Sequence, residues 1–269
     1  MEKRPSRHKN EELGHDVFSG IYTAGVEQLR AITTKYGLVS LASDIGVGYS
    51  VNEDRVFMDT SRNIFGVADG IGGYPHGAEA AQIIAEEIVQ GIKAGVSPQV
   101  IQFEASSRMK QNQILMGGAC YLYFQIEKKS ASIFWAGDVQ LKLFDQNGNL
   151  EYSSKSTEIA KAPRGQSAGI VSRDSIDVMN YSTIIAASDG LWDNVDTGDV
   201  AEIVKNTDSR EPNVIAKKLF NLAKKGMEEG FLTDYGGIVP GKRIDYGKND
   251  NISIVVFQKL PLISTLKYD

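Results

Sequence analysis

Residues 119–138, ACYLYFQIEKKSASIFWAGD, contain two apolar segments on either side of a Lys-Lys turn. The first segment, 119–126, is apolar at almost every position, which is typical of a strand in a sheet covered on both faces. The second, SIFWAGD (132–138), is short enough to return beside it as the partner strand. These residues therefore predict an antiparallel pair in the middle of a layered β structure.

Strands with the same character flank this pair. RVFMDT (55–60) and NIFGVAD (63–69) predict a hairpin around Ser61-Arg62, and VQLKLF (139–144) returns into LEYSS (150–154) through Asn147-Gly148. Asn-Gly between such runs is the strongest short-range hairpin signal. Three further strands are predicted: LVSLAS (38–43), the buried strand at the start of STIIAASDG (182–190), and NISIVVF (251–257).

Helix pairs separate the strand blocks. Apolar residues recur at three- and four-residue steps from Ala80 to Ile92, which predicts an amphipathic helix. Ser97-Pro98, a cap followed by proline, predicts a second helix to about Gln113. A later pair is predicted from about Thr197 to Asn206 and from Pro212 onward. This order favours an α+β fold in which antiparallel sheets pack together with helices outside, and it disfavours a doubly wound parallel sheet.

Four segments carry little periodicity. Residues 1–36 are predicted as an N-terminal extension with one short helix at Val26–Tyr36, and residues 260–269 as a C-terminal tail. Residues 154–175 are predicted as a long surface segment. Residues 230–249 contain five glycines and a proline, and irregular stretches of that length are usually functional or disordered. The folded domain is expected to span residues 37–259.

The composition excludes several classes of function. The 269 residues include 29 Lys and Arg against 34 Asp and Glu, a net charge of −5, which gives no support to a nucleic-acid or anionic-membrane partner. One cysteine excludes an internal disulfide and a cysteine metal cluster. No signal-peptide pattern and no run of ~20 apolar residues is present. A cytoplasmic location is expected, although delivery by a specialised secretion system would leave no such mark.

Acidic residues recur where apolar strands begin or end. They are Glu53-Asp54, Asp69, Asp138, Asp189 and Asp250. A single Asp-Gly after a strand is more readily a turn than an active site, because glycine accepts positive φ and aspartate caps its own backbone. Several carboxylates on one rim of a sheet would repel one another and favour hard divalent cations, Mg²⁺ or Mn²⁺. Both interpretations stay open at this point.

Other chemistries have weaker support. The glycine-rich stretches 46–54 and 69–77 lack the lysine of a P-loop, and no GxSxG motif exists. Cys120 lies inside an apolar strand and is predicted as a core residue. His76 follows a proline at a helix start, where a capping or surface role is expected. Trp135 and Trp192 are predicted to lie in the core.

Five motifs resemble those of one family. They are SLASDIGVGYSVNEDR (40–55), FGVADGIGG (65–73), WAGD (135–138), AASDGLWDNV (186–195) and KNDNISIVV (248–256). Their order and spacing are similar to those of the metal-dependent protein phosphatases (protein phosphatase 2C, PPM), in particular the bacterial-like version. The resemblance covers roughly Leu38 to Phe257. It implies a four-layer αββα sandwich, with two antiparallel β-sheets flanked by pairs of helices.

The resemblance also implies a di-metal site with two Mn²⁺ or Mg²⁺ ions. The positions that match the family's metal ligands are Glu53, Asp69, Gly70, Asp189 and Asp250. In this assignment Asp69 bridges the ions, the Gly70 carbonyl and Glu53 complete one site, and Asp54 holds water bound to the metals. Glu53, Asp54 and Asp69 are thereby implied as the catalytic residues. Such ions lower the pKa of water and offset charge on the phosphoryl oxygens.

Several positions depart from the family pattern. Tyr49 stands where the family has an arginine that binds the substrate phosphate, and tyrosine donates one hydrogen bond without replacing a bidentate cation. Arg55, Arg164 and Arg173 are alternative sources of that cation, of which Arg164 is our choice. Ile114 stands near the place of an aspartate that supplies a third metal, so a third ion is not expected.

The resemblance implies a serine/threonine phosphatase. We expect a monomer acting on phosphoprotein substrates of a cognate Ser/Thr kinase system, with no nucleic-acid or membrane partner. Two alternatives stay open. One is a catalytically weak or inactive relative that binds phosphoproteins or regulates a partner, which Tyr49 and the altered GDSR motif at residues 137–140 favour. The other is a metal-dependent hydrolase of a small phosphorylated molecule.

Overall fold

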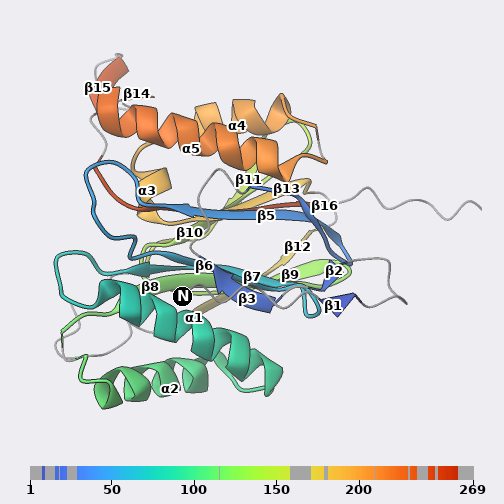
Figure 1. Cartoon of the computed structure of the whole chain (residues 1–269). Helices are drawn as coiled ribbons and strands as arrows, with labels where there is room; N and C mark the ends of the chain where they lie inside the picture. The colour runs from blue at the N-terminus through green and yellow to red at the C-terminus, as the bar shows by residue number, and fades with distance from the viewer. Residues whose placement is uncertain are drawn as a thin grey trace, which may run out of the picture.

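Two six-stranded antiparallel sheets lie face to face in the computed structural model (Figure 1). The structure describes residues 8–9, 16–17, 19–22, 29–114, 116–157, 171–178, 181–208, 210–229, 231–234, 242–245 and 248–259. The first sheet has the strand order β12 (Ser172–Asp177), β9 (Ser130–Ala136), β8 (Ala119–Ile126), β7 (Ile64–Gly70), β6 (Arg55–Asp59), β3 (Ser19–Tyr22). The second has the order β11 (Leu150–Ser153), β10 (Gln140–Phe144), β13 (Thr183–Ala187), β16 (Ile252–Lys259), β5 (Gly37–Asp44), β4 (Ile32–Thr33).

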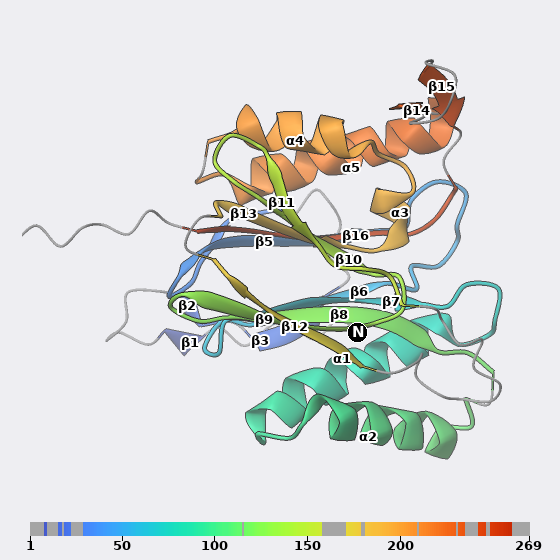
Figure 2. The same cartoon turned by 180° about the vertical axis from the view of Figure 1, so that it is seen from behind.

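Helices cover the outer face of each sheet, as the two opposite views show (Figures 1 and 2). The first sheet carries α1 (Gly77–Lys93) and α2 (Pro98–Gln111), and the second carries α3 (Asp189–Trp192), α4 (Thr197–Lys205) and α5 (Pro212–Glu229). At the start of α2 the Ser97 hydroxyl accepts the Val100 N–H at 3.4 Å, as its sequence predicts. The predicted α+β fold, a four-layer sandwich, is confirmed.

Side chains of β8 show why the layers form. Cys120, Leu122 and Phe124 lie in the core between the two sheets, while Tyr121 and Tyr123 lie in a second core beneath α1 and α2. Successive side chains of a strand point to opposite faces, so a strand that is apolar throughout must be covered on both. A third core lies beneath α3, α4 and α5. Three apolar cores therefore hold four layers together.

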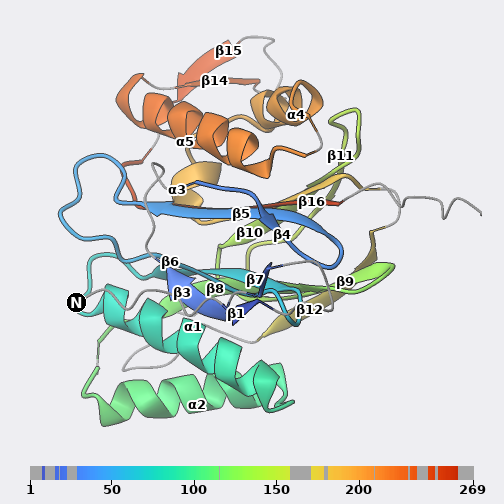
Figure 3. The same ribbon diagram turned by 45° about the vertical axis from the view of Figure 1, so that its right-hand side comes forward.

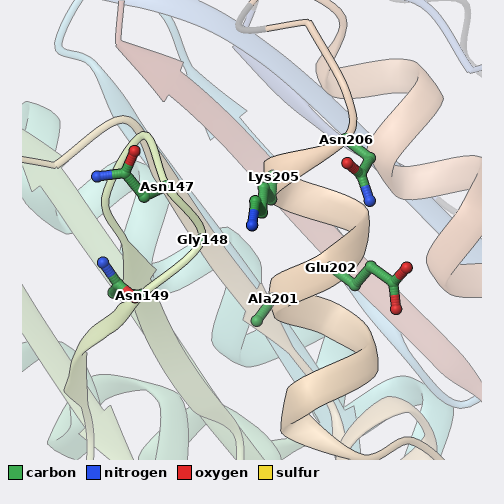
Figure 4. A pocket seen from close by; sticks show the side chains of 7 residues that line it. All are labelled: Asn147, Gly148, Asn149, Ala201, Glu202, Lys205 and Asn206. Atoms are coloured by element: carbon green, nitrogen blue, oxygen red, sulfur yellow. The ribbon is translucent and has the colours of Figure 1, made fainter.

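The β10–β11 hairpin packs against α4. Gly148 has φ 81°, and a Cβ there would lie 2.5 Å from the Ala201 carbonyl oxygen, so this turn position requires glycine. Beside this contact is a pocket of about 350 Å³ between the hairpin and α4 (Figure 4). Its lining residues are Asn147, Gly148, Asn149, Ala201, Glu202, Lys205 and Asn206. None of the carboxylates predicted for a metal site lines it.

Three sequence-based predictions of secondary structure are wrong. In the described part of Val26–Tyr36 there is no helix; β4 pairs there with β5, and the Thr34 hydroxyl bridges the turn to Gly37. The β-branched residues of this segment favour strand over helix. Residues 154–175 are predicted as a surface segment without strands, but Ser172–Asp177 form the edge strand β12, whose alternate side chains are exposed. The stretch 230–249 contains a hairpin of β14 (Phe231–Asp234) and β15 (Lys242–Asp245).

The segment before residue 37 contributes to both sheets. Ser19–Tyr22 (β3) pairs with β6, and β4 pairs with β5, so each sheet receives an edge strand from it. A further short pair, β1 (His8–Lys9) and β2 (Asp16–Val17), precedes them. The predicted C-terminal tail, residues 260–269, lies outside the described residues. Within the described chain, no helix has the length and apolar character needed to cross a bilayer.

Candidate metal centre

The strand register brings the predicted carboxylates to one end of the sandwich. In the first sheet Arg55 pairs with Ala68, and Gly70 pairs with Ala119, so β6 begins beside the place where β7 ends. In the second sheet Ala187 pairs with Ile254, so β13 ends beside the start of β16. The β5–β6 and β7–α1 connections leave the sandwich at this same end (Figures 1 and 3). We call this end the carboxylate rim; its acidic residues are Glu53, Asp54, Asp69, Asp138, Asp189 and Asp250.

Hydrogen bonds join the sheets at the carboxylate rim. The Ser188 hydroxyl, at the end of β13, donates to the Asp54 carboxylate at 2.9 Å. The Glu53 N–H donates to the Asn251 side-chain oxygen at 2.7 Å. Asp54, Ser188 and Asn251 are each at most 2% exposed. These contacts fix Glu53 and Asp54, which precede β6, relative to the ends of β13 and β16 in the other sheet.

The Ser188–Asp54 bond belongs to a closed ring of hydrogen bonds. The Asp54 N–H donates to the Asn52 side-chain oxygen at 3.0 Å, and the Asn52 amide donates to the Ser43 hydroxyl at 2.8 Å. The Ser253 hydroxyl donates to Ser43 at 2.8 Å, and its N–H donates to Ser188 at 3.0 Å. A buried polar network that is satisfied in this way rigidifies its surroundings. The ring therefore holds the Asp54 carboxylate in one orientation.

Glycines allow the loops to approach one another closely. A Cβ on Gly46, which has φ 72°, would lie 1.7 Å from the Asp250 carbonyl oxygen. A Cβ on Gly77, the first residue of α1, would lie 2.9 Å from the Glu53 carboxylate. A Cβ on Gly70 would lie 3.0 Å from the Glu53 Cβ and 2.5 Å from the Gly77 backbone. The start of α1 and the end of β7 thus pack directly around Glu53.

Burial raises the pKa of five rim carboxyl groups, and neighbouring carboxylates contribute to each increase. The pKa of Asp54 rises to about 6 although the Ser188 hydroxyl opposes the rise, and that of Asp189 rises to about 7. The pKa of Asp69 is held well above its ordinary value by burial and then by the charges of its acidic neighbours. The pKa values of Glu53 and Asp250 are raised for the same reasons. The rim therefore concentrates negative charge that a cation would stabilise.

The donor set fits a hard divalent cation by its chemistry. All candidate side-chain ligands at the rim are carboxylate oxygens, the ligands that Mg²⁺ and Mn²⁺ prefer. Their arrangement is not closed around an ion: among the described residues, no three His, Cys, Asp or Glu side chains converge tightly enough to enclose one. The structure thus brings the carboxylates to one rim without forming a finished coordination shell.

The predicted phosphate-binding residues have different outcomes. Tyr49 lies on the rim, 41% exposed, and the charge of Asp250, then burial and further carboxylates, raise the pKa of its phenol, so the phenol stays protonated. Arg164 lies outside the described residues. Arg55 donates to the Gln82 side chain at 2.9 Å and to two backbone carbonyls, and Arg173 stacks on the Phe134 ring. The guanidinium groups of Arg55 and Arg173 thus contact other residues of the protein.

Four other predictions concern residues near the rim. Cys120, Trp135 and Trp192 are buried, as predicted, and burial raises the pKa of the Cys120 thiol. His76 is exposed at the start of α1, where its ring contacts the Glu79 carboxylate, so the predicted surface role is confirmed. Cys120 pairs with Asp69 in the strand register, and burial, then the charges of Asp138 and Asp69, keep its thiol protonated, which disfavours it as a nucleophile.

The sequence-based analysis missed the residues that orient the carboxylates. Asn251 holds three backbone groups: its oxygen accepts the Glu53 N–H, and its amide donates to the carbonyls of Ile45 and Val51 at 2.8 and 3.2 Å. Ser188 immediately precedes Asp189, as Asn251 follows Asp250. The available signal was therefore a small polar residue beside a strand-end aspartate, in a position where an apolar residue would otherwise be expected.

The fold is that of the serine/threonine phosphatases of the protein phosphatase 2C type. The serine-threonine phosphatase 2C from Toxoplasma gondii superposes with a TM-score of 0.66 at 12% identity, over 90% of this chain and 99% of that one. Stp1 from Staphylococcus aureus gives 0.63 at 14%, over 83% and 95%. PstP/Ppp from Mycobacterium tuberculosis gives 0.61 at 16%, over 83% and 98%. No protein-family model matches the sequence, and no curated protein matches it.

Proposed function

We propose that this protein is a metal-dependent phosphatase that hydrolyses phosphoserine and phosphothreonine in proteins. The observation that carries the proposal is the convergence of Glu53, Asp54, Asp69, Asp189 and Asp250 on one rim by strand register. The fold, which is shared with the serine/threonine phosphatases named above, supports it. The protonated Cys120 thiol and the contact of the His76 ring with Glu79 agree with hydrolysis by water.

Five residues would hold two Mn²⁺ or Mg²⁺ ions: Glu53, Asp69, Gly70 through its carbonyl, Asp189 and Asp250. When bound, such ions activate water near neutral pH and neutralise phosphoryl oxygens. The side chains at the rim must therefore be ionised to bind them. The raised pKa values show that the ionised carboxylates are destabilised when no cation is present. Bound cations would stabilise the same ionised carboxylates through electrostatic attraction.

The chain's own polar residues orient the reacting groups. Asp54 accepts from Ser188, so its carboxylate is held in one orientation, in which it could act as a proton acceptor for water. Asn251 fixes the backbone at Glu53. Tyr49 keeps its phenolic proton and offers one hydrogen bond to a substrate phosphoryl oxygen. We propose that this single bond takes the place of the family's arginine contact.

The test is a phosphatase assay on purified protein with a phosphothreonine peptide and Mn²⁺ or Mg²⁺. We expect turnover that EDTA suppresses, and a loss of at least about 10³-fold in Asp69→Asn, because the variant would lose a carboxylate that would hold the metal ions. Glu104→Gln, an exposed change on α2, is the matched control and should retain full activity. Equal activity in Asp69→Asn and Glu104→Gln would contradict the proposal.

One specific observation favours a second candidate, a weak or inactive relative that binds phosphoproteins. Tyr49 replaces a cation, and the rim carboxylates do not close around an ion among the described residues. In that case a phosphopeptide should bind without turnover at any Mn²⁺ concentration.

A third candidate is a hydrolase of small phosphorylated molecules. It is distinguished by comparing turnover of phosphopeptides with turnover of small phosphate monoesters. A phosphoprotein substrate, a cognate Ser/Thr kinase and a monomeric state remain parts of the leading proposal.

A further inference from the structure

Exposed apolar side chains are concentrated beside the carboxylate rim. In the described chain eight large apolar side chains are exposed, and five of them lie on three loops at this end. They are Ile45 (37% exposed), Tyr49 (41%), Val51 (54%), Tyr74 (44%) and Met116 (56%). The other three, Val100, Phe103 and Leu150, lie on α2 and β11. We call the five the apolar collar.

The three loops, residues 45–53 (which carry Ile45, Tyr49 and Val51), 71–76 (which carry Tyr74) and 116–118 (which carry Met116), lie against one another. The Ile71 N–H, at the start of the Tyr74 loop, donates to the Gly118 carbonyl at 3.0 Å, next to Met116 in sequence. A Cβ on Gly117 would lie 3.0 Å from the Pro75 carbonyl oxygen. In the loop of residues 45–53, the carbonyls of Ile45 and Val51 both accept hydrogen bonds from the Asn251 side-chain amide. Glu53, at the end of the loop of residues 45–53, packs against Gly70, which immediately precedes the loop of residues 71–76.

The collar borders the carboxylates directly. The phenol of Tyr49 lies within the field of Asp250, Glu53, Asp189 and Asp69, so this collar residue is adjacent to the rim. Clustered exposed apolar side chains on a soluble protein usually mark an interaction site. Tyrosine and methionine are enriched where proteins recognise one another, because both offer a large contact area that adapts to the partner.

We propose that the apolar collar binds the residues flanking a phosphoserine or phosphothreonine and selects substrates in which those residues are apolar. This rests on the function proposed above and names the class of substrate. The phosphate is directed to the rim, and the adjoining peptide covers Val51, Tyr74 and Met116. Acidic flanking residues are disfavoured, because the carboxylates at the rim repel them and the nearby ammonium of Lys248 is already paired with Asp193 at 2.7 Å.

The experiment compares three phosphothreonine peptides with Mn²⁺, whose flanking residues are Leu and Val, Ser and Gly, or Glu. We expect kcat/KM to be about tenfold or more higher for the Leu/Val peptide than for the Ser/Gly peptide, and lowest for the Glu peptide. In the combined variant Val51→Ser, Tyr74→Ser, Met116→Ser the preference should fall to about one. Phe103→Ser, an equally apolar-to-polar change at an exposed site on α2, should keep the preference.

A ratio near one in the wild type, or an unchanged ratio in the combined variant, would overturn the inference. Because the three side chains are exposed, thermal unfolding of the combined variant should match the wild type. If the combined variant is less stable than the wild type, the single variants Val51→Ser and Met116→Ser replace it. Each should lower the kcat/KM ratio of the Leu/Val peptide to the Ser/Gly peptide about twofold or more.

A binding assay separates this inference from the proposed phosphatase activity. Fluorescent peptides that carry a non-hydrolysable phosphonate in place of phosphothreonine are titrated with the protein and Mn²⁺. Suppose that no phosphothreonine peptide is hydrolysed, but the phosphonate peptide with Leu and Val still binds most tightly and loses this preference in the combined variant. The phosphatase proposal then fails, and the inference that the collar binds apolar flanking residues stands. Equal binding of all peptides overturns it. Collar-dependent binding to phosphatidylcholine vesicles, or collar-dependent dimerisation in sedimentation velocity, without peptide preference, also overturns it.

Discussion

The Ser188 hydroxyl donates a hydrogen bond of 2.9 Å to the Asp54 carboxylate, and this bond crosses from one sheet to the other. The two residues are 134 positions apart in the chain. Ser188 also accepts the Ser253 N–H, so one hydroxyl satisfies two buried groups. The bond places a carboxylate at the meeting point of the two sheets, where neither sheet alone would orient it.

Replacing this hydroxyl tests its role. We expect Ser188→Ala to lower the free energy of unfolding by about 1–3 kcal/mol, because it leaves a buried carboxylate oxygen and a backbone N–H without their partner. Mn²⁺-dependent turnover should fall by about 10–100-fold, the usual effect of losing an orienting partner. Urea denaturation and steady-state kinetics measure the two effects. Ser182→Ala is the control: its hydroxyl makes a 3.4 Å contact just before β13, at the end of that strand away from the rim, and both effects should be small there.

The Asn251 side chain offers a second test. Asn251→Ala removes three hydrogen bonds to the loop of residues 45–53. We expect a loss of about 2–4 kcal/mol in stability, from roughly 1 kcal/mol for each bond. Mn²⁺ affinity, measured by isothermal titration calorimetry, should fall at least about tenfold because Glu53 is released. Asn249→Ala, two residues earlier and exposed, should change neither quantity. Unaltered Mn²⁺ affinity in Asn251→Ala would show that this loop does not position a ligand.

The raised carboxyl pKa values predict how stability depends on pH without metal. The pKa of Asp189 is 3.8 in the ordinary state and about 7 in the folded protein, so the folded state binds more protons between these values. Its contribution to stability is therefore present below pH 3.8 and is lost as the pH rises through about 7. Asp54, with a pKa of about 6, acts in the same direction. Thermal unfolding in EDTA should show this loss between about pH 4 and pH 7.

The variant Asp189→Asn separates this effect from the general titration of the protein. It should raise stability in EDTA at about pH 8 by about 1 kcal/mol or more, since one pKa unit corresponds to about that energy. It should also remove most of the stabilisation that Mn²⁺ gives the wild type at the same pH. Glu104→Gln, with the same loss of charge on α2, should do neither. A wild type in EDTA whose stability increases over the same pH range would contradict the assignment.

Much of the fold was accessible from local sequence. The apolar run of β8, the Asn147-Gly148 turn and the Ser97-capped start of α2 each follow from short-range chemistry, and each is confirmed. The edge strands β4 and β12 were missed because their partners, and not their own periodicity, determine them. A polar strand at a sheet edge needs only backbone hydrogen bonds, which the side-chain pattern does not reveal.

The grouping of the carboxylates at one end of the sandwich was partly predictable, whereas their role as metal ligands stays a prediction. Asp69, Asp189 and Asp250 end or precede apolar strands, and that pattern is visible in the sequence. The contacts that orient the rim are not, because Glu53 and its partner Asn251 are 198 positions apart. The apolar collar was also invisible: Val51, Tyr74 and Met116 lie on separate loops that only the tertiary structure brings together.

Tyr49 provides the last test, because we propose that its phenol binds the substrate phosphate. Tyr49→Phe removes the phenolic donor and should raise KM for a phosphothreonine amide about tenfold to 100-fold, the value of one hydrogen bond to a charged group. Tyr49→Arg offers two parallel donors and a full charge to the phosphoryl oxygens, and should lower KM by about tenfold. Steady-state kinetics with Mn²⁺ measure both, and the small substrate avoids contacts with the other four residues of the collar.

Tyr74→Arg is the matched control for added charge. It places the same guanidinium on the neighbouring loop, so it attracts the phosphate to the rim without replacing the phenol of Tyr49. We expect a change in KM of less than about twofold at about 0.15 M salt, where the Debye length is about 8 Å. Equal gains in Tyr49→Arg and Tyr74→Arg would mean that the arginine acts through general attraction. A gain confined to Tyr49→Arg would show that position 49 contacts the phosphate and that tyrosine limits its affinity there.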